Sequence, residues 1–235
     1  MRDRLRLYWS HCGTYRMDER SASHIGKPVL KSLDDVRALG AEVKSRGFTG
    51  FKCNMYLFDD QPRRFGGGFA GRVGAPGFPE LNAERSVIRG VYDEIAAFNE
   101  GTDNDVDILL DLNYNFKVEG YIKMIRALEP LELFWAELDI YNPEALSYIR
   151  DRTNTPIASC ESLYGIRDFR LFFQMKSMDV AIIDVPWNGI WQSYKIACIA
   201  DAHEVNVAPH NFYGHMSTFM SAHLCAATVS YTHLR

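Results

Sequence analysis

Short apolar runs alternate along the chain with longer amphipathic stretches, which is typical of successive βα units around a parallel sheet. The runs with strand character are Leu5–Trp9, Gly50–Cys53, Asp107–Leu110, Phe134–Ala136, Ile157–Ser159, Val180–Ile183 and Val205–Ala208. The stretches with helical character are Leu33–Ser45, Ala83–Phe98, Val118–Leu128, Pro143–Arg150, Ile166–Gln174, Trp191–His203 and His215–Ala227. These seven strand-plus-helix units predict an α/β fold, an incomplete (β/α)8 barrel that lacks one unit of a closed barrel.

Helix-start signals support two of these boundaries. Ser32 precedes the first helical stretch and is a favourable N-cap, and Asp34 and Asp35 then fall in the first turn, where the helix dipole favours acids. Pro143 stands where a first helical turn accepts proline.

The connection Leu57–Glu80 departs from the pattern, because it is rich in Gly, Pro and Arg and has neither a helical nor a strand period. A loop of this length in a compact domain is either functional or disordered. It follows a strand end closely, so we favour a lid over the active-site face and keep a flexible insertion as the alternative.

The composition fits an ordinary soluble protein. Of 235 residues, 47% are hydrophobic and 24% charged, and the formal net charge is −4, which disfavours nucleic acid or an anionic membrane as a partner. The cysteines are scattered and form no C-x-x-C pair, so reduced thiols and a cytoplasmic location are expected. The first residues, MRDRLRLYWS, include no apolar stretch of the length that a signal peptide needs, and no run approaches 18 apolar residues, so we expect no membrane span.

A polar residue follows nearly every strand from the third onward: Asp111, Glu137, Glu161, Asp184 and His210, at intervals of 23 to 26 residues. Parallel barrel strands place their C-terminal ends on one face, so these side chains are expected to converge. Taken singly, each could be a helix cap or a solvated loop residue. As a set, the carboxylates of Asp111, Glu137 and Glu161 would repel one another strongly unless a cation lies between them, and oxygen ligands suit Mg²⁺.

His210 gains a candidate partner, and two further residues are candidates for the same face. His210 ends a strand adjacent to the one that Asp184 ends, and an Asp partner suits a histidine acid/base. Lys52 ends the second strand, where a lysine would lie inside the barrel. His11 ends the first strand and faces the same side, without an obvious partner.

These residues resemble the enolase superfamily, specifically its mandelate racemase subgroup. The resemblance rests on FKCN, LLDLNYNF, FWAELD, IASCESLYG, IIDVPWNGI and VAPHN, which follow in family order over nearly the whole chain. It implies that Asp111, Glu137 and Glu161 bind Mg²⁺, that Asn113 contacts the substrate, and that Asp184 and His210 form the catalytic dyad. Lys52 would match the first lysine of the family's K-x-K motif.

One departure from the family bears on the reaction. The second lysine of K-x-K is Asn54 in this chain, and an amide is no useful base, so two-base racemisation is disfavoured. Asn54 and His11 are then candidates for substrate binding. A single histidine that removes the C2 proton and protonates the leaving 3-hydroxyl suffices for dehydration of an aldonate or aldarate through a metal-stabilised enediolate.

Two departures concern the chain ends. We expect an incomplete barrel domain over residues 1–228, without the family's N-terminal capping domain, and an atypical tail over residues 229–235.

The sequence thus predicts a Mg²⁺-dependent acid-sugar dehydratase, a hydro-lyase of carbohydrate acid catabolism whose partner is a small acid sugar. Self-association is left open. The alternatives are a racemase, epimerase or cycloisomerase of the same superfamily, or an inactive metal-binding fragment.

Overall fold

The structure, a computed structural model, describes residues 2–59, 61–66 and 83–228. Their contacts divide the chain into two compact units. The β1–β5 unit comprises Trp9–Glu137 with Thr153–Thr155, and the β6–β8 unit comprises Met1–Tyr8, Leu138–Arg152 and Pro156–Arg235. No helix within the described ranges has both the length and the apolar character needed to cross a membrane.

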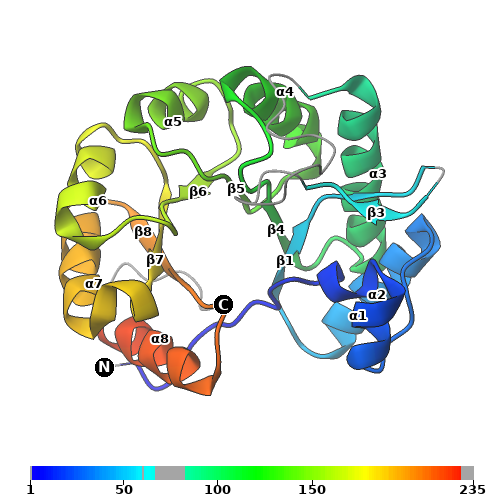
Figure 1. Ribbon diagram of the computed structural model, residues 1–235, viewed down its shortest axis with the longest axis horizontal. Helices are drawn as coiled ribbons and strands as arrows, with labels where there is room; N and C mark the ends of the chain where they lie inside the picture. The colour runs from blue at the N-terminus through cyan, green and yellow to red at the C-terminus, as the bar shows by residue number, and fades with distance from the viewer. Residues whose placement is uncertain (1, 60, 67–82, 229–235) are drawn as a thin grey trace. The chain divides into compact units, whose positions relative to one another are not determined.

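The β1–β5 unit contains three parallel strands in sequence order (Figure 1). These are β1 (Gly50–Asn54), β4 (Asp107–Asp111) and β5 (Trp135–Glu137), with β1 paired to β4 and β4 to β5. Its helices are α1 (Glu19–His24), α2 (Leu33–Ser45), α3 (Arg85–Gly101) and α4 (Val118–Leu128), with the 3₁₀ turns η1 (Thr14–Arg16) and η2 (Glu129–Leu131).

A short antiparallel hairpin extends from the end of β1. It is formed by β2 (Tyr56–Leu57) and β3 (Arg63–Arg64). The prediction that the Leu57–Glu80 connection has no strand structure is therefore wrong at its start, because Arg63 and Arg64 pair with the residues that follow β1. Residues 60 and 67–80 of the expected lid lie outside the described residues, as does the tail 229–235.

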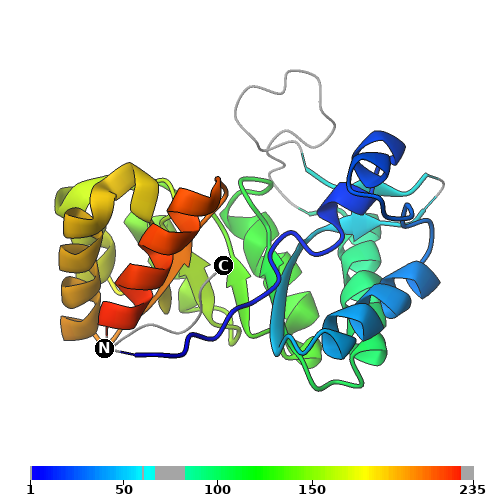
Figure 2. The same ribbon diagram turned by 90° about the horizontal axis from the view of Figure 1, so that it is seen from below.

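The β6–β8 unit repeats the βα pattern, and Figure 2 shows its last two helices side by side. The strands β6 (Ile157–Ser159), β7 (Val180–Asp184) and β8 (Asn206–His210) pair in parallel in that order. The helices are α5 (Pro143–Arg150), α6 (Gly165–Gln174), α7 (Val185–Ala202) and α8 (His215–Ala227).

The parallel strands are mainly apolar because most of their residues are buried on both faces of the sheet. Every residue of β1 and of β7 is buried, as expected for parallel strands that helices cover. The amphipathic helices supply the cover: α2 turns Val36, Leu39 and Val43 inward, each 1% exposed or less. The fold class is α/β with successive parallel βα units, consistent with an incomplete (β/α)8 barrel.

Two expected elements differ from the structure by more than a shift of one to three residues at their ends. The strand expected at Leu5–Trp9 is wrong as a strand, because in the described residues of this segment only isolated bridges form, one of them between Trp9 and Phe51. The helix expected at Trp191–His203 begins at Val185, since Pro186 occupies its first turn and a kink at Gly189 (φ 70°) joins two helical pieces.

Candidate active site

Three polar residues stand side by side where the strands of the β1–β5 unit end. Asn54 is the cross-strand partner of Asp111, and Asp111 is the partner of Glu137. Each is the last residue of its strand. Carboxyl ends of neighbouring parallel strands lie at one edge of a sheet, so the regular pairing alone brings the two carboxylates together.

Lys52 lies between these carboxylates. Its Nζ atom is 2.6 Å from Glu137 Oε1 and 3.3 Å from Asp111 Oδ2. Lys52 is 2% exposed and Glu137 1% exposed. Buried charges persist in proteins when they are paired, and one ammonium against two carboxylates leaves this cluster with a formal charge of −1.

One oxygen of the cluster is left without a partner. Glu137 Oε2 is buried and has no hydrogen-bond partner among the described residues. Such an atom is costly to bury unless something binds it. A buried carboxylate oxygen, in a cluster that already carries net negative charge, fits a hard divalent cation such as Mg²⁺. Within the described ranges, no group of three or more His, Cys, Asp or Glu side chains is arranged to hold a metal.

Asn113 covers the Asp111 carboxylate. Its backbone N–H and its Nδ2 both donate to Asp111 Oδ1, at 3.0 and 2.6 Å. The residue has a φ of 45°, in the left-handed region that Asn tolerates better than most residues. Its backbone carbonyl accepts a hydrogen bond from the Tyr121 hydroxyl. These contacts fix the side chain of Asn113 beside the cluster.

The side chain of Asn54 is oriented by a hydrogen bond from Thr14. Its Oδ1 accepts a hydrogen bond from Thr14 Oγ1 at 2.8 Å, which turns its Nδ2 toward Asn113 Oδ1 at 3.5 Å. The amide therefore presents a donor beside Asp111 and has no basic atom to offer. Thr14 in turn contacts the Tyr56 hydroxyl, which donates to the Cys12 carbonyl.

A second cluster stands at the strand ends of the β6–β8 unit. Asp184 and His210 are cross-strand partners, and His210 Nδ1 lies 2.6 Å from Asp184 Oδ2. Asp184 is fully buried, and its Oδ1 accepts the backbone N–H of Trp187 at 2.8 Å. The contact between Asp184 Oδ2 and His210 Nδ1 orients the imidazole, so that proton transfer would use Nε2. His210 Nε2 is 3.3 Å from Glu161 Oε2.

Tyr213 belongs to this cluster, although it was not predicted from the sequence. Its hydroxyl donates to Asp184 Oδ2 at 2.8 Å, and its ring meets the His210 ring edge-on. Burial, followed by the neighbouring Asp184 carboxylate, raises the pKa of the Tyr213 phenol, so the hydroxyl keeps its proton. The only sequence signal is a tyrosine three positions after His210.

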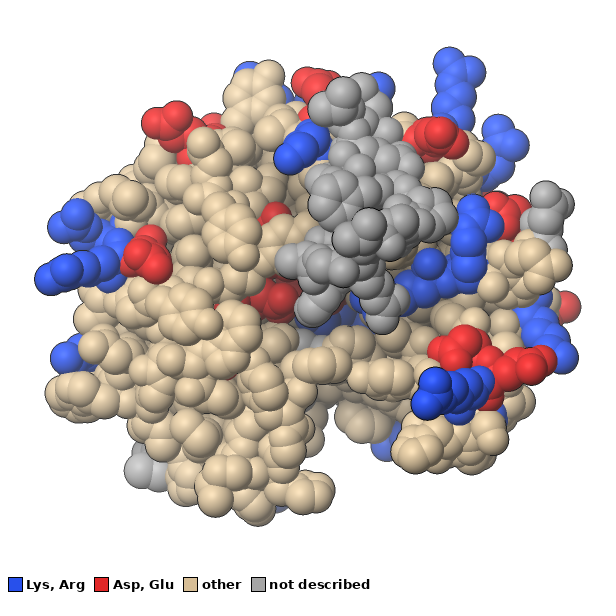
Figure 3. All heavy atoms as spheres, in the orientation of Figure 1, with Lys and Arg blue, Asp and Glu red and all other residues tan. Residues whose placement is uncertain are grey.

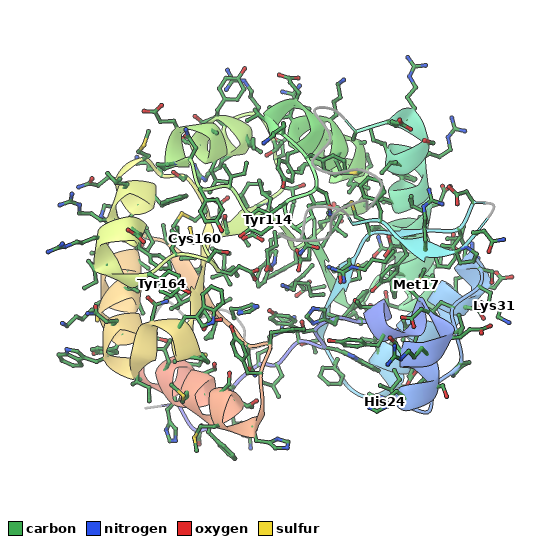
Figure 4. All side chains as sticks on the ribbon, in the orientation of Figure 1. Met17, His24, Lys31, Tyr114, Cys160 and Tyr164 are labelled. Atoms are coloured by element: carbon green, nitrogen blue, oxygen red, sulfur yellow. The ribbon has the colours of Figure 1, made fainter. Side chains whose placement is uncertain are left out.

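Asn188, near the start of α7, links this helix to the residues between β6 and α6. Its Oδ1 accepts the backbone N–H of Gly165 at 2.7 Å, and its Nδ2 donates to the carbonyls of Leu163 and Asp184. Tyr164, labelled in Figure 4, stacks on Trp187 with parallel rings. The residues between β6 and α6 are thus held to the start of α7 by the side chain of Asn188, which was not predicted from the sequence.

The structure brings the predicted site residues together in two groups. Lys52, Asn54, Asp111, Asn113 and Glu137 lie in the β1–β5 unit, and Glu161, Asp184 and His210 lie in the β6–β8 unit. Glu161 thus belongs to the group of His210, and its sharing of a metal with Asp111 and Glu137 stays a prediction. His11 lies against Tyr15 and beside Ser10, and its role in substrate binding also stays a prediction.

Comparison with known proteins gives a family match over most of the chain. The family described as enolase C-terminal domain-like matches residues 35–235. D-gluconate dehydratase of Thermoproteus tenax is 26% identical over 65% of this chain and 31% of its own length. Arabinonate dehydratase of Saccharolobus solfataricus is 27% identical over 86% of this chain and 53% of its own length. The chain thus spans about a third to a half of these relatives.

Among solved structures, a Burkholderia xenovorans protein provisionally named L-alanine-DL-glutamate epimerase superimposes with a TM-score of 0.92. It is 44% identical, and the match covers 100% of this chain and 58% of that one. A second structure under the same provisional name, with a TM-score of 0.91, is bound to magnesium and fumarate.

Proposed function

The chain belongs to the enolase C-terminal domain-like family, and from that premise we propose that it is the barrel part of a Mg²⁺-dependent acid-sugar dehydratase. The observation that carries the proposal concerns the two described strand ends where a proton-transfer group was expected, of which one carries such a group and the other does not. His210 is held by the buried Asp184, whereas the strand end beside Asp111 carries the amide of Asn54.

In the proposed reaction, His210 Nε2 removes the proton from the carbon next to the substrate carboxylate. Asp184 keeps the ring oriented and stabilises the imidazolium that forms. The same histidine then returns the proton to the 3-hydroxyl, which leaves as water. The resulting enol tautomerises to a 2-keto-3-deoxy acid, so the net change is the loss of one water.

The β1–β5 unit would hold the acid end of the substrate. The Lys52 ammonium offsets negative charge that develops on the carboxylate, and the Asn54 and Asn113 side chains offer hydrogen bonds beside it. Bound Mg²⁺, held by Asp111 and Glu137 with Glu161 as the third expected ligand, would supply further positive charge there. The proposal requires that both clusters serve one substrate, as strand ends do in (β/α)8 enzymes.

Relatives of two kinds bear on the proposal. The names of the curated relatives favour dehydration of sugar acids. The magnesium and fumarate in a 44% identical structure support a carboxylate ligand and this metal.

An epimerase is the second candidate, because the provisional name of that same protein favours it. An epimerase would exchange the C2 proton with solvent deuterium and return substrate of inverted configuration. It would need a second proton donor on the opposite face, which Asn54 cannot provide.

The test is formation of 2-keto acid from a panel of aldonates and aldarates with Mg²⁺, followed together with deuterium exchange at C2. Dehydration by the wild type, and its loss in His210→Asn, would support the proposal. Exchange and inversion without keto acid would replace it with the epimerase reading.

A further inference from the structure

Arg64 reaches the candidate site from the β2–β3 hairpin. In that hairpin, Arg64 pairs with Tyr56, two residues beyond the end of β1. Its Nη2 atom donates to Asn113 Oδ1 at 3.2 Å, and Asn113 Nδ2 in turn donates to Asp111 Oδ1 at 2.6 Å. Arg64 was not predicted as a site residue, because it lies in the connection expected to have no regular structure.

The neighbouring arginine has a different environment. Successive strand residues point to opposite faces, and Arg63 pairs with Asp59. Arg64 points to the face of Asn113, and no carboxylate in the described part of the chain forms an ion pair with it. Figure 3 shows basic side chains over this hairpin. The two arginines are matched in position and exposure, but only Arg64 has a guanidinium without an anionic partner among the described residues.

The charges of the cluster indicate what Arg64 can bind. Lys52 is already engaged by Asp111 and Glu137. Arg64 is exposed and gives a single N–H to a neutral amide, whereas a guanidinium has five N–H donors in a fork that matches a carboxylate. An anionic group placed beside Asn113 would therefore gain a charge-assisted, two-point contact.

We propose that Arg64 binds the second carboxylate of a dicarboxylic sugar acid, so that the substrate is an aldarate rather than an aldonate. This inference rests on the proposed function and names its substrate class. The first carboxylate would lie at Lys52. Two hydrogen bonds with an amide between them separate Arg64 from Asp111, a span of about 8 Å at most. One small acid with a carboxylate at each end can reach both groups.

The test compares acids that differ only at the far end of the chain. Galactarate and D-galactonate form one pair, and D-glucarate and D-gluconate form another. In each pair, one carboxylate is replaced by a hydroxymethyl group. Dissociation constants are measured by calorimetry with Mg²⁺ in a His210→Asn background, which prevents turnover and makes the readout independent of activity.

Arg64→Gln should weaken binding of the preferred aldarate about tenfold and leave its aldonate partner within about twofold. Arg64→Lys should give an intermediate loss, because a lysine keeps the charge but not the fork. Arg63→Gln, the matched control, should change neither constant. If Arg64 only supported Asn113, both acids would weaken equally, and that result would overturn the proposal.

Two other outcomes separate the inference from the proposed function. If Arg64→Gln weakens aldarate binding but the wild type forms no keto acid, the inference is supported and the proposed dehydratase function is refuted. If the wild type forms keto acid but Arg64→Gln binds aldarates as tightly as the protein with Arg64, the proposed function is supported and the inference is refuted. Failure of both aldarates to bind would also refute the inference.

Discussion

Lys52 neutralises part of a buried negative charge, and at the scale of single residues this gives the clearest prediction. Lys52→Met leaves Asp111 and Glu137 facing each other without a cation. We expect the free energy of unfolding to fall by about 3–5 kcal/mol without metal and to recover in part with Mg²⁺. Urea denaturation with and without Mg²⁺ measures both.

Lys44 supplies the control for this change. It also lies between two carboxylates, Asp103 and Asp105, but all three side chains are 37% exposed or more. Lys44→Met should cost about 1 kcal/mol or less and show no response to Mg²⁺. Equal losses for the two lysines would mean that burial of the Lys52 cluster contributes nothing.

Glu94 makes stability depend on pH. It is fully buried in α3, and its Oε2 accepts the backbone N–H of Tyr56 at 2.7 Å. Burial raises the pKa of Glu94 well above its ordinary value, so the folded state binds the proton more tightly than the unfolded state. The contribution of Glu94 to stability should therefore be most favourable below the ordinary pKa of a glutamate and should fall as the pH rises above it, by up to about 1.4 kcal/mol per pH unit.

Glu94→Gln removes the titrating group and keeps an acceptor for Tyr56. Urea denaturation between pH 4.5 and 7.5 should show a flatter stability profile for the variant than for the wild type. Parallel profiles would mean that Glu94 is not the source of the slope.

At the scale of elements, the contact between α2 and α3 depends on a glycine. A Cβ atom on Gly101 would lie 2.2 Å from the backbone carbonyl oxygen of Arg37, so the two helices would have to move apart. We expect Gly101→Ala to lower the free energy of unfolding by about 3 kcal/mol, although alanine favours a helix by about 1 kcal/mol. Gly90→Ala in the same helix meets only the end of the Leu57 side chain and should cost less in the same denaturation experiment.

Element boundaries were predictable from the sequence where local chemistry sets them. Leu33–Ser45 and Pro143–Arg150 agree with the structure at both ends, because Ser32 and Pro143 act within their own first turns. Five strands were predicted to end one or two residues too early, whereas Ile157–Ser159 agrees with β6. A polar residue after an apolar run is as typical of a loop as of a strand end. Asp111 and His210 are nevertheless paired within their strands.

The site was predictable only as far as strand order fixes it. The adjacency of Asp111 to Glu137, and of Asp184 to His210, follows from one polar residue per parallel strand. Tyr213, Asn188 and Arg64 were not predicted, because their contacts depend on how particular loops turn. No period or spacing in the sequence encodes such a turn.

At the scale of the whole molecule, metal binding should stabilise the fold. If Asp111 and Glu137 hold Mg²⁺ in the folded state and not in the unfolded one, saturation at about 100 times the dissociation constant adds about 2.7 kcal/mol. Thermal melts at increasing Mg²⁺ should show a rising midpoint. Glu137→Gln keeps the side-chain shape and should abolish the rise, and a rise that survives this change would place the ion elsewhere.

The separate clusters of the two units have a consequence for how the protein can be altered. His210 and its supports, Asp184 and Tyr213, all lie in the β6–β8 unit, whereas Asn113 and Arg64 lie in the β1–β5 unit. Under the proposed function, substitutions at Asn113 or Arg64 that change which acid is bound would therefore leave the residues that support His210 unchanged. A mutant library confined to the codons for β1 through β5 would vary the substrate preference while the residues around His210 stay constant. Natural divergence could change the substrate in the same way.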